Sequence, residues 1–218
     1  PDGESLCGFI YTSGTTGNPK GVRLTHNNIT SNVNAVQAIF PMDETDRSLS
    51  FLPWAHSFGQ TVELHCGLSF GASMAICPDA NRLTEFLPEV RPTLLFSVPR
   101  VFNKIYDRLN KRIASEKPIT AFLMRRALQV SRAKKDLEAQ GGHSAWLDLQ
   151  FNFLDKKVLS KIRGILGGRL RYAFSGGAAI SKEVASFIDS LGIIVYEGYG
   201  LSETSPIASA NYPGNQRI

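Results

Sequence analysis

Cysteine is scarce in this chain, and no two cysteines stand close together. The three that occur among 218 residues are Cys7, Cys66 and Cys77. Their number is odd and no CxxC spacing is present, so the sequence supports neither a disulfide framework nor a zinc site. We expect all three to be buried thiols.

The chain also lacks a long apolar run. No run approaches the ~18 residues of a membrane-spanning helix, and no charged segment followed by an apolar one stands at the N-terminus. These absences predict a protein that is cytoplasmic or peripherally bound to a membrane. Because the chain begins at Pro1 and ends at Ile218 in the turn-prone stretch NYPGNQRI, we expect both ends to be cut from a longer protein.

Charge is unevenly distributed in a composition that is otherwise ordinary for a folded protein, with 43% hydrophobic and 20% charged residues. The formal net charge is +5. The segment from Arg100 to Ala139 alone holds eleven Lys and Arg against four Asp and Glu. Such a segment can attract nucleic acid, anionic lipid or an acidic cosubstrate. A solvated helical face is the plainer interpretation.

Short apolar runs alternate with helical patterns along the chain. A run at 6–11 is followed by apolar residues spaced 4, 3 and 4 apart from Ile29 to Phe40, which is one face of a helix. Further strand-like runs are 48–52, 74–77, 93–98, 170–174 and 193–196. This alternation favours parallel βαβ units. We predict a three-layer α/β fold whose mostly parallel sheet carries helices on both faces.

A helical excursion separates two of these strands. Pro99 begins a helical pattern whose apolar positions run from Phe102 to Ile113 on one side. Further helical patterns occupy 119–139 and 146–165, and the breaker GGHS separates them. The sequence therefore predicts an excursion of helices at about 100–165.

A hydroxyl- and glycine-rich segment follows the first strand-like run, Tyr11-Thr-Ser-Gly-Thr-Thr-Gly-Asn-Pro-Lys-Gly21. Hydroxyl donors, glycines that let backbone N–H groups approach a ligand, and one lysine make a phosphate cradle by composition. A Walker-type loop needs Ser or Thr after its lysine, whereas Gly21 follows Lys20, so that motif is excluded. A flexible loop after a strand is the plain alternative.

A second informative segment follows the last strand-like run, Tyr196-Glu-Gly-Tyr-Gly-Leu-Ser-Glu-Thr204. Its GxG is a weak signal, and a dinucleotide fingerprint fails because Glu203 occupies the place of the third glycine. A Rossmann dehydrogenase is therefore disfavoured. Alone, Glu203 would be a surface carboxylate, although one carboxylate together with phosphate oxygens is enough to hold Mg²⁺.

These two segments, in this order, resemble the signatures of the adenylate-forming superfamily, which includes acyl-CoA synthetases, firefly luciferase and the adenylation domains of peptide synthetases. The resemblance implies that Glu203 helps hold Mg²⁺, that Ser202 contacts the α-phosphate and that Tyr199 packs on adenine. Lys20, Ser202 and Glu203 are the implied catalytic residues. The implied ATP-binding residues are Thr12, Ser13, Gly14, Thr15, Thr16, Gly17, Lys20, Gly177, Ala178, Glu197, Gly198, Tyr199 and Ser202.

Two further segments match the same family. The glycine turn SGGAAI at 175–180 is implied to surround the adenine and the acyl carbonyl, although a tight strand-to-helix turn explains its glycines equally well. His56, in FLPWAHSFGQ, matches a position that lines the acyl site, whereas a lone histidine is more often structural. The implied substrate-binding residues are His56, Gly176, Gly177 and Gly200.

The helical excursion narrows the resemblance. Its opening VPRVFNKIYDRL and its ending SKIRGILGGRLRYAFSGGA are similar to the long-chain and very-long-chain fatty acyl-CoA synthetases. Some of these gate the acyl tunnel with a Trp where this chain has Gln60, so gating by that device is not expected. The resemblance implies a fragment, 1–218, of the large N-terminal domain, with the C-terminal domain absent.

The implied reaction activates a long-chain fatty acid with ATP and Mg²⁺ to an acyl-adenylate, from which coenzyme A displaces AMP. An aryl or other carboxylic acid as substrate is one alternative. A basic lipid-binding module without catalysis is the alternative of a different class. We expect fatty acid and coenzyme A as substrates, contact of residues 100–139 with an anionic membrane, and no nucleic acid partner.

Overall fold

An antiparallel hairpin opens the fold. The computed structural model describes residues 2–13 and 17–216. Strands β1 (Leu6–Thr12) and β2 (Lys20–Thr25) pair antiparallel, with Thr12 opposite Lys20. The sequence predicted a strand, a loop and then a helix here, so β2 was missed. Its alternation of Val22 and Leu24 with exposed residues is too short to stand out.

The main sheet has six strands in the order β4-β3-β5-β6-β7-β8. The first five are parallel, and β8 runs antiparallel to β7. The strands are β3 (Arg47–Ser50), β4 (Ser73–Ile76), β5 (Leu94–Ser97), β6 (Tyr172–Ser175), β7 (Ile194–Gly200) and β8 (Ile207–Ala210). The predicted mostly parallel sheet is confirmed.

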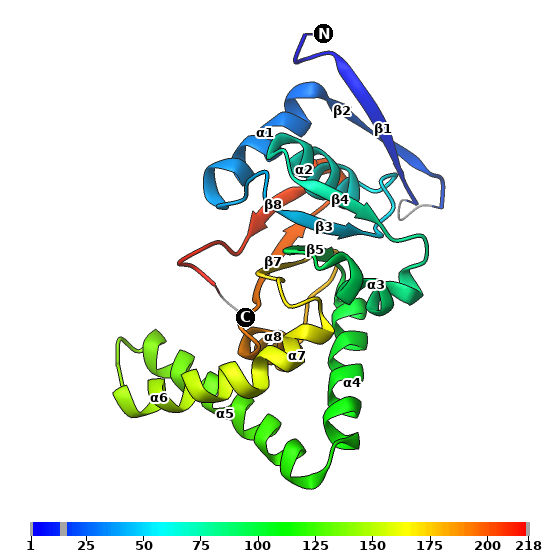
Figure 1. Cartoon of the computed structure of the whole chain (residues 1–218). Coiled ribbons are helices and arrows are strands. Elements are labelled where there is room, and N and C mark those ends of the chain that lie inside the picture. Colours follow the sequence, from blue (N-terminus) through cyan, green and yellow to red (C-terminus); the bar gives the residue numbers. More distant parts are fainter. Residues whose placement is uncertain (1, 14–16, 217–218) are drawn as a thin grey trace.

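Helices cover both faces of this sheet (Figure 1). One buried cluster joins α1 (His26–Ile39), the π-helical turn η1 (Phe58–His65) and the short α2 (Cys66–Ser69) to one face. A second cluster joins α3 (Leu83–Val90), α4 (Pro99–Ser115) and α8 (Lys182–Ser190) to the other. A 3-10 turn, η2 (Ala80–Arg82), precedes α3. The predicted three layers are therefore present.

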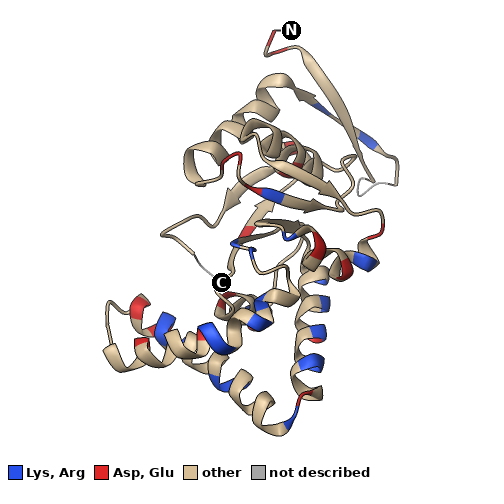
Figure 2. Ribbon diagram, in the orientation of Figure 1, with Lys and Arg blue, Asp and Glu red and all other residues tan. Residues whose placement is uncertain are grey.

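The helical excursion is confirmed as well. It comprises α4, α5 (Pro118–Ala139), α6 (Ala145–Leu154), the π-helical turn η3 (Asp155–Leu159) and α7 (Ser160–Ile165). The predicted stripe on α4 is buried, from Phe102 to Ile113. Helix α4 leads away from the sheet, and α5 and α6 return beside each other (Figure 1). Lys and Arg are frequent along α4 and α5 (Figure 2).

Two of the three cysteines lie in the interior of the fold. Cys66 and Cys77 are buried thiols, as expected, but Cys7 is exposed on β1. Within residues 2–13 and 17–216, no helix combines the length and the apolar character needed to cross a membrane.

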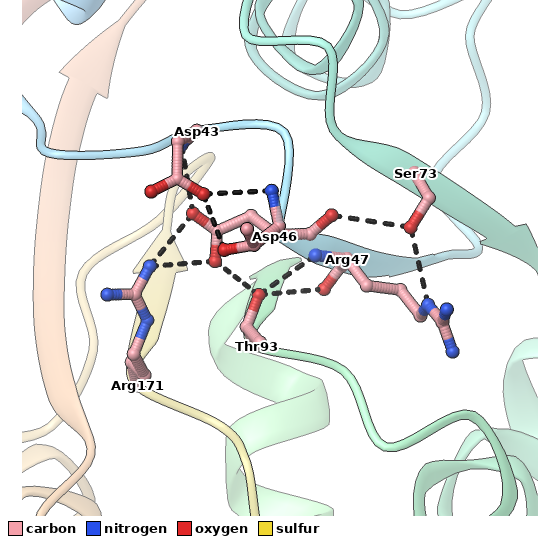
Figure 3. Close-up of polar contacts among 7 residues, drawn as sticks. Asp43, Asp46, Arg47, Ser73, Thr93 and Arg171 are labelled. Carbon is pink, nitrogen blue, oxygen red and sulfur yellow. Dashed lines mark hydrogen bonds and ion pairs between the residues drawn. The ribbon is translucent and has the colours of Figure 1, made fainter.

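A buried carboxylate joins the amino ends of three neighbouring strands. Asp46, just before β3, is 1% exposed. Arg171, just before β6, donates from Nη2 to both of its oxygens at 2.8 Å. The hydroxyl of Thr93, just before β5, donates to the same carboxylate and accepts from the Arg47 N–H at 2.9 Å. Figure 3 shows Arg171 and Thr93 converging on Asp46. Sequence reasoning did not find this cluster.

Replacing Arg171 with methionine leaves the Asp46 carboxylate buried without its cation. We expect R171M to lower the free energy of unfolding by about 1–2 kcal/mol, less than the ~3 kcal/mol typical of a fully buried pair, because the Arg171 side chain is itself 44% exposed. Urea denaturation measures this. Arg169 is exposed, and R169M should change stability by less than about 0.5 kcal/mol. Equal stabilities of the two variants would contradict the role of the ion pair, and D46N/R171M should recover part of the loss.

A second buried carboxyl lies in η1. Glu63 is 0% exposed, and its Oε2 accepts a hydrogen bond from the Ser50 hydroxyl at 2.9 Å. Its Oε1 has no hydrogen-bond partner within the described residues. Burial raises the pKa of Glu63 to about 7, because the charged form loses its hydration. The folded protein thus holds this proton more tightly than the unfolded chain does.

Stability should therefore depend on pH through Glu63. The free energy of unfolding should fall as pH rises from about 4.5 to 7, since the native state binds more protons in that window. We expect E63Q to remove this slope and to raise stability at pH 8 by roughly 1–3 kcal/mol, because each pKa unit corresponds to about 1.4 kcal/mol. The exposed Glu44 offers the control E44Q, which should keep the slope. A pH profile unchanged in E63Q would contradict the assignment.

Candidate active site

A cavity of about 730 Å³ opens at the carboxyl ends of the central strands. It is lined by residues at the ends of β5, β6 and β7, by α1, by the 51–59 segment, by the start of α4, and by 206–211. In open α/β sheets this edge is the usual ligand site. The cavity is therefore the candidate active site.

Eight residues singled out in the sequence line this cavity. They come from the loop before η1, from the turn after β6, and from β7 and the turn that follows it. They are His56, Gly176, Gly177, Glu197, Gly198, Tyr199, Gly200 and Ser202. The fold thus gathers segments that are more than a hundred residues apart in sequence.

Other candidates do not line the cavity. Thr12, Ser13, Gly17 and Lys20 belong to the β1–β2 hairpin, and Ala178 and Glu203 also lie outside the lining. Gly14, Thr15 and Thr16 lie outside the described residues. Lys20 begins β2, and β2 contacts the 3-10 turn η4 (Ser202–Thr204). The hairpin and the turn that carries Glu203 are therefore neighbours at one side of the cavity.

The glycine turn after β6 is attached to β7 by one hydrogen bond. The Ile180 N–H donates to Oε1 of Glu197 at 2.8 Å. Gly177 has φ of +82°, a conformation that favours glycine. A Cβ on Gly176 would lie 3.2 Å from the Phe58 ring. Glu197, which the resemblance assigns to ATP binding, thus also fixes the shape of the turn.

The turn after β7 requires glycine for a different reason. A Cβ on Gly200 would lie 1.9 Å from the carbonyl oxygen of Pro206, so any side chain would force the two backbone segments apart. The Thr204 hydroxyl accepts from the Leu201 N–H at 2.9 Å. These contacts hold the stretch that carries Ser202 and Glu203 in a compact loop.

Asn32 on α1 anchors the same loop. Its Nδ2 donates to the Thr204 carbonyl at 3.2 Å, and its Oδ1 accepts from the Ile207 N–H at 2.7 Å. Sequence reasoning missed this residue. The available signal was a polar residue within the apolar helical stripe that also holds Ile29, Val33 and Val36.

The inner wall of the cavity is aromatic. Phe96 and Phe174, on neighbouring strands, stack with ring centroids 4.8 Å apart, and Phe40 meets Tyr196 edge to face at 5.0 Å. All four rings line the cavity. Burial raises the pKa of the Tyr196 hydroxyl, as expected beside apolar neighbours. Sequence reasoning placed these rings in strands and helices but did not predict that they line a site.

Two cations also line the cavity. Arg100 and Lys104 are one turn apart at the start of α4, and both are exposed. The Lys104 Nζ donates to Oδ1 of Asn81 at 3.2 Å. The site therefore combines an aromatic interior, glycine-shaped polar turns and cations at its edge, an arrangement suited to an amphipathic or anionic ligand.

Comparison with known proteins identifies the class. The family model described as AMP-binding enzyme matches residues 1–218. The chain therefore belongs to the AMP-binding enzyme family.

Individual relatives are fatty-acid ligases by name. The chain is 35% identical over 199 residues to long-chain-fatty-acid–CoA ligase FadD15 of Mycobacterium bovis, covering 90% of the chain and 33% of the relative. It is 34% identical over 227 residues to long-chain-fatty-acid–CoA ligase 5 of Mus musculus, covering 99% and 31%. The chain thus spans about a third of the length of these relatives.

Solved structures agree in fold. Apo MatB from Rhodopseudomonas palustris superposes with a TM-score of 0.65 at 21% identity, covering 100% of this chain and 33% of that one. The anthranilate CoA ligase AuaEII, in complex with anthranoyl-AMP, gives 0.63 at 21%, covering 99% and 33%. These likenesses establish the fold.

Removing the Asn32 side chain should loosen the loop that it holds. N32L leaves the Thr204 carbonyl and the Ile207 N–H without their partner, and we expect a loss of about 2 kcal/mol for these two groups. Hydrogen exchange at the Ile207 amide should accelerate accordingly. The matched control is N34L, because Asn34 is an exposed residue on the same helix. Equal exchange rates at Ile207 in both variants would show that Asn32 does not hold the loop.

Proposed function

We propose that the whole protein activates a long-chain fatty acid in two steps. The carboxylate oxygen of the acid attacks the α-phosphorus of ATP, and pyrophosphate leaves with the bonding electron pair. The thiolate of coenzyme A then attacks the acyl carbonyl of the adenylate, and AMP leaves. The observation that carries the proposal is the cavity of about 730 Å³, in which an aromatic wall meets the polar turns of β6 and β7.

The polar side of the site fits a nucleotide. The hydroxyl of Ser202 and backbone N–H groups of the two glycine turns are the available donors, and the hydrogen bonds of the Ile180 and Leu201 N–H groups fix the turns that carry them. Fixed donors stabilise the charge that develops on phosphoryl oxygens, which is usually the largest catalytic contribution. Lys20, at the start of β2 beside η4, adds a positive charge. Tyr199 is exposed along the cavity, so its ring face is free to stack on a purine.

Glu203 fits a magnesium site. Its carboxylate is exposed on the turn η4, and it forms no hydrogen bond or ion pair with any residue that the structure describes. One or two carboxylates together with substrate phosphate oxygens are a common Mg²⁺ ligand set. A bound Mg²⁺ would neutralise phosphate charge.

The aromatic wall supports an apolar acid. The inner part of the cavity is lined by four buried rings, those of Phe40, Phe96, Phe174 and Tyr196. An alkyl chain that packs against them is stabilised by about 25 cal/mol for each Å² of apolar surface removed from water. A flat aryl acid would also pack against these rings. Relatives named long-chain-fatty-acid ligases favour the fatty acid, whereas AuaEII is an anthranilate ligase. A lipid-binding module without catalysis would not require the glycine-shaped turns.

Glu203→Gln in the full-length protein tests the catalytic assignment. The substitution removes the negative charge and keeps the shape, so we expect ATP–pyrophosphate exchange to fall by about 10²-fold or more while the melting temperature stays the same. The matched control is E89Q, because Glu89 is also exposed but lies on α3. Near-native ATP–pyrophosphate exchange in E203Q would contradict the role of Glu203 as a magnesium ligand.

The same assay ranks the substrates. Long-chain fatty acids should support exchange more strongly than benzoate-type or amino acids. Strongest exchange with an aryl acid would replace the proposed substrate, and ATP-independent lipid binding without any exchange would replace the proposed enzyme by a binding module.

A further inference from the structure

Helices α5 and α6 carry large apolar side chains that nothing in the described chain covers. On α5 and α6 six such residues are between 40% and 77% exposed. They are Ile119, Phe122, Leu123, Trp146, Leu149 and Phe153. Isolated exposed apolar residues need no explanation, but a continuous patch marks an interaction site.

The exposed apolar residues of α5 lie beside those of α6. On α5 the residues at 119, 122, 123 and 126 form one stripe, and on α6 those at 146, 149, 150 and 153 form another. Arg126 and Gln150 belong to these stripes, and the guanidinium of Arg126 donates to Oε1 of Gln150 at 3.4 Å. This bond brings the stripes together. We call the six apolar residues with Arg126 and Gln150 the α5–α6 face.

Four cations lie close in sequence to residues of the α5–α6 face. Lys117 and Arg125 lie on or next to α5, and Lys156 and Lys157 follow α6 in η3. All four are exposed, and none forms an ion pair with a residue in the described part of the chain. Figure 2 shows Lys and Arg along α5, in the helical excursion that extends away from the sheet. By contrast, the acidic Asp148 is already paired with Lys134.

We propose that the α5–α6 face binds an anionic lipid membrane. A helix with Trp, Phe and Leu on one side and Lys or Arg beside them lies in the plane of the lipid headgroups, and each cation near an anionic leaflet strengthens the contact. The unpaired cations favour an anionic occupant, and the exposed apolar side chains of two adjacent helices offer a contact area wider than one helix. The sequence predicted membrane contact through 100–139, and the face extends it to α6. This inference is independent of the proposed function, because it involves neither ATP nor acyl substrate.

The tryptophan on the face reports binding directly. The chain has two tryptophans, Trp54 and Trp146, so the variant W54F leaves Trp146 as the single fluorophore. It is mixed at low salt with vesicles of phosphatidylcholine, with and without phosphatidylglycerol. We expect flotation with the phosphatidylglycerol vesicles, a blue shift of Trp146 emission, quenching by brominated acyl chains, and weaker binding as salt rises.

Matched variants separate the contribution of the apolar side chains from that of the cations. In the W54F background, F122S/F153S should weaken partitioning by about tenfold or more, since two apolar side chains no longer leave water. K117E/R125E should reduce the preference for phosphatidylglycerol, while Lys156 and Lys157 remain. The controls are I76S, at a residue of β4 that is 62% exposed, and R23E, at an exposed residue of β2. Both should bind like W54F.

Three results would overturn the proposal. The first is no flotation of W54F at low salt. The second is self-association, seen by sedimentation, that F122S/F153S abolishes while vesicle binding is absent; the face would then join two copies. The third is vesicle binding by W54F that neither pair of substitutions weakens, because another surface would then make the contact. Circular dichroism of each variant checks that the helices are retained.

Discussion

The buried Asp46 carboxylate is the constraint on which the arrangement of the sheet depends. Its bonds to Arg171 and Thr93 fix the amino ends of β3, β5 and β6 relative to one another. Once those ends are fixed, the parallel register carries the positions of Ser97, Ser175 and Glu197 across three strands. The ligand-facing turns begin from this row. A charge at one edge of the sheet thus determines the geometry at the opposite edge.

The candidate site is assembled from turns whose shape is set by backbone contacts. Gly200 allows a carbonyl to approach, Asn32 closes the following loop from α1, and Glu197 holds the turn at Gly177. Most of these contacts involve backbone groups. The aromatic wall of the cavity consists of rings on β5, β6 and β7 that pack against one another. The polar turns and the rigid aromatic wall of the site are therefore formed by different residues.

Much of this could be predicted from the sequence, because the decisive signals were local. Apolar runs located six of the eight strands in the described part of the chain, all except β2 and β8, and the stripe on α4 located a buried helix. The glycine-containing segments at 175–180 and 196–204 supplied seven of the eight candidate residues that line the cavity. What was missed depends on contacts between distant residues: Asp46 and Arg171 are 125 positions apart. Strand β2 was missed because its inward positions, Val22 and Leu24, are only two.

The bond between the Ile180 N–H and Glu197 has a thermodynamic consequence for ligand capture. It links the turn after β6 to the carboxyl end of β7 before a ligand binds. A ligand that touches both segments does not have to order them separately, so less conformational entropy is lost on binding. A small molecule can then bind through a few weak contacts, because the two segments that it contacts are already ordered.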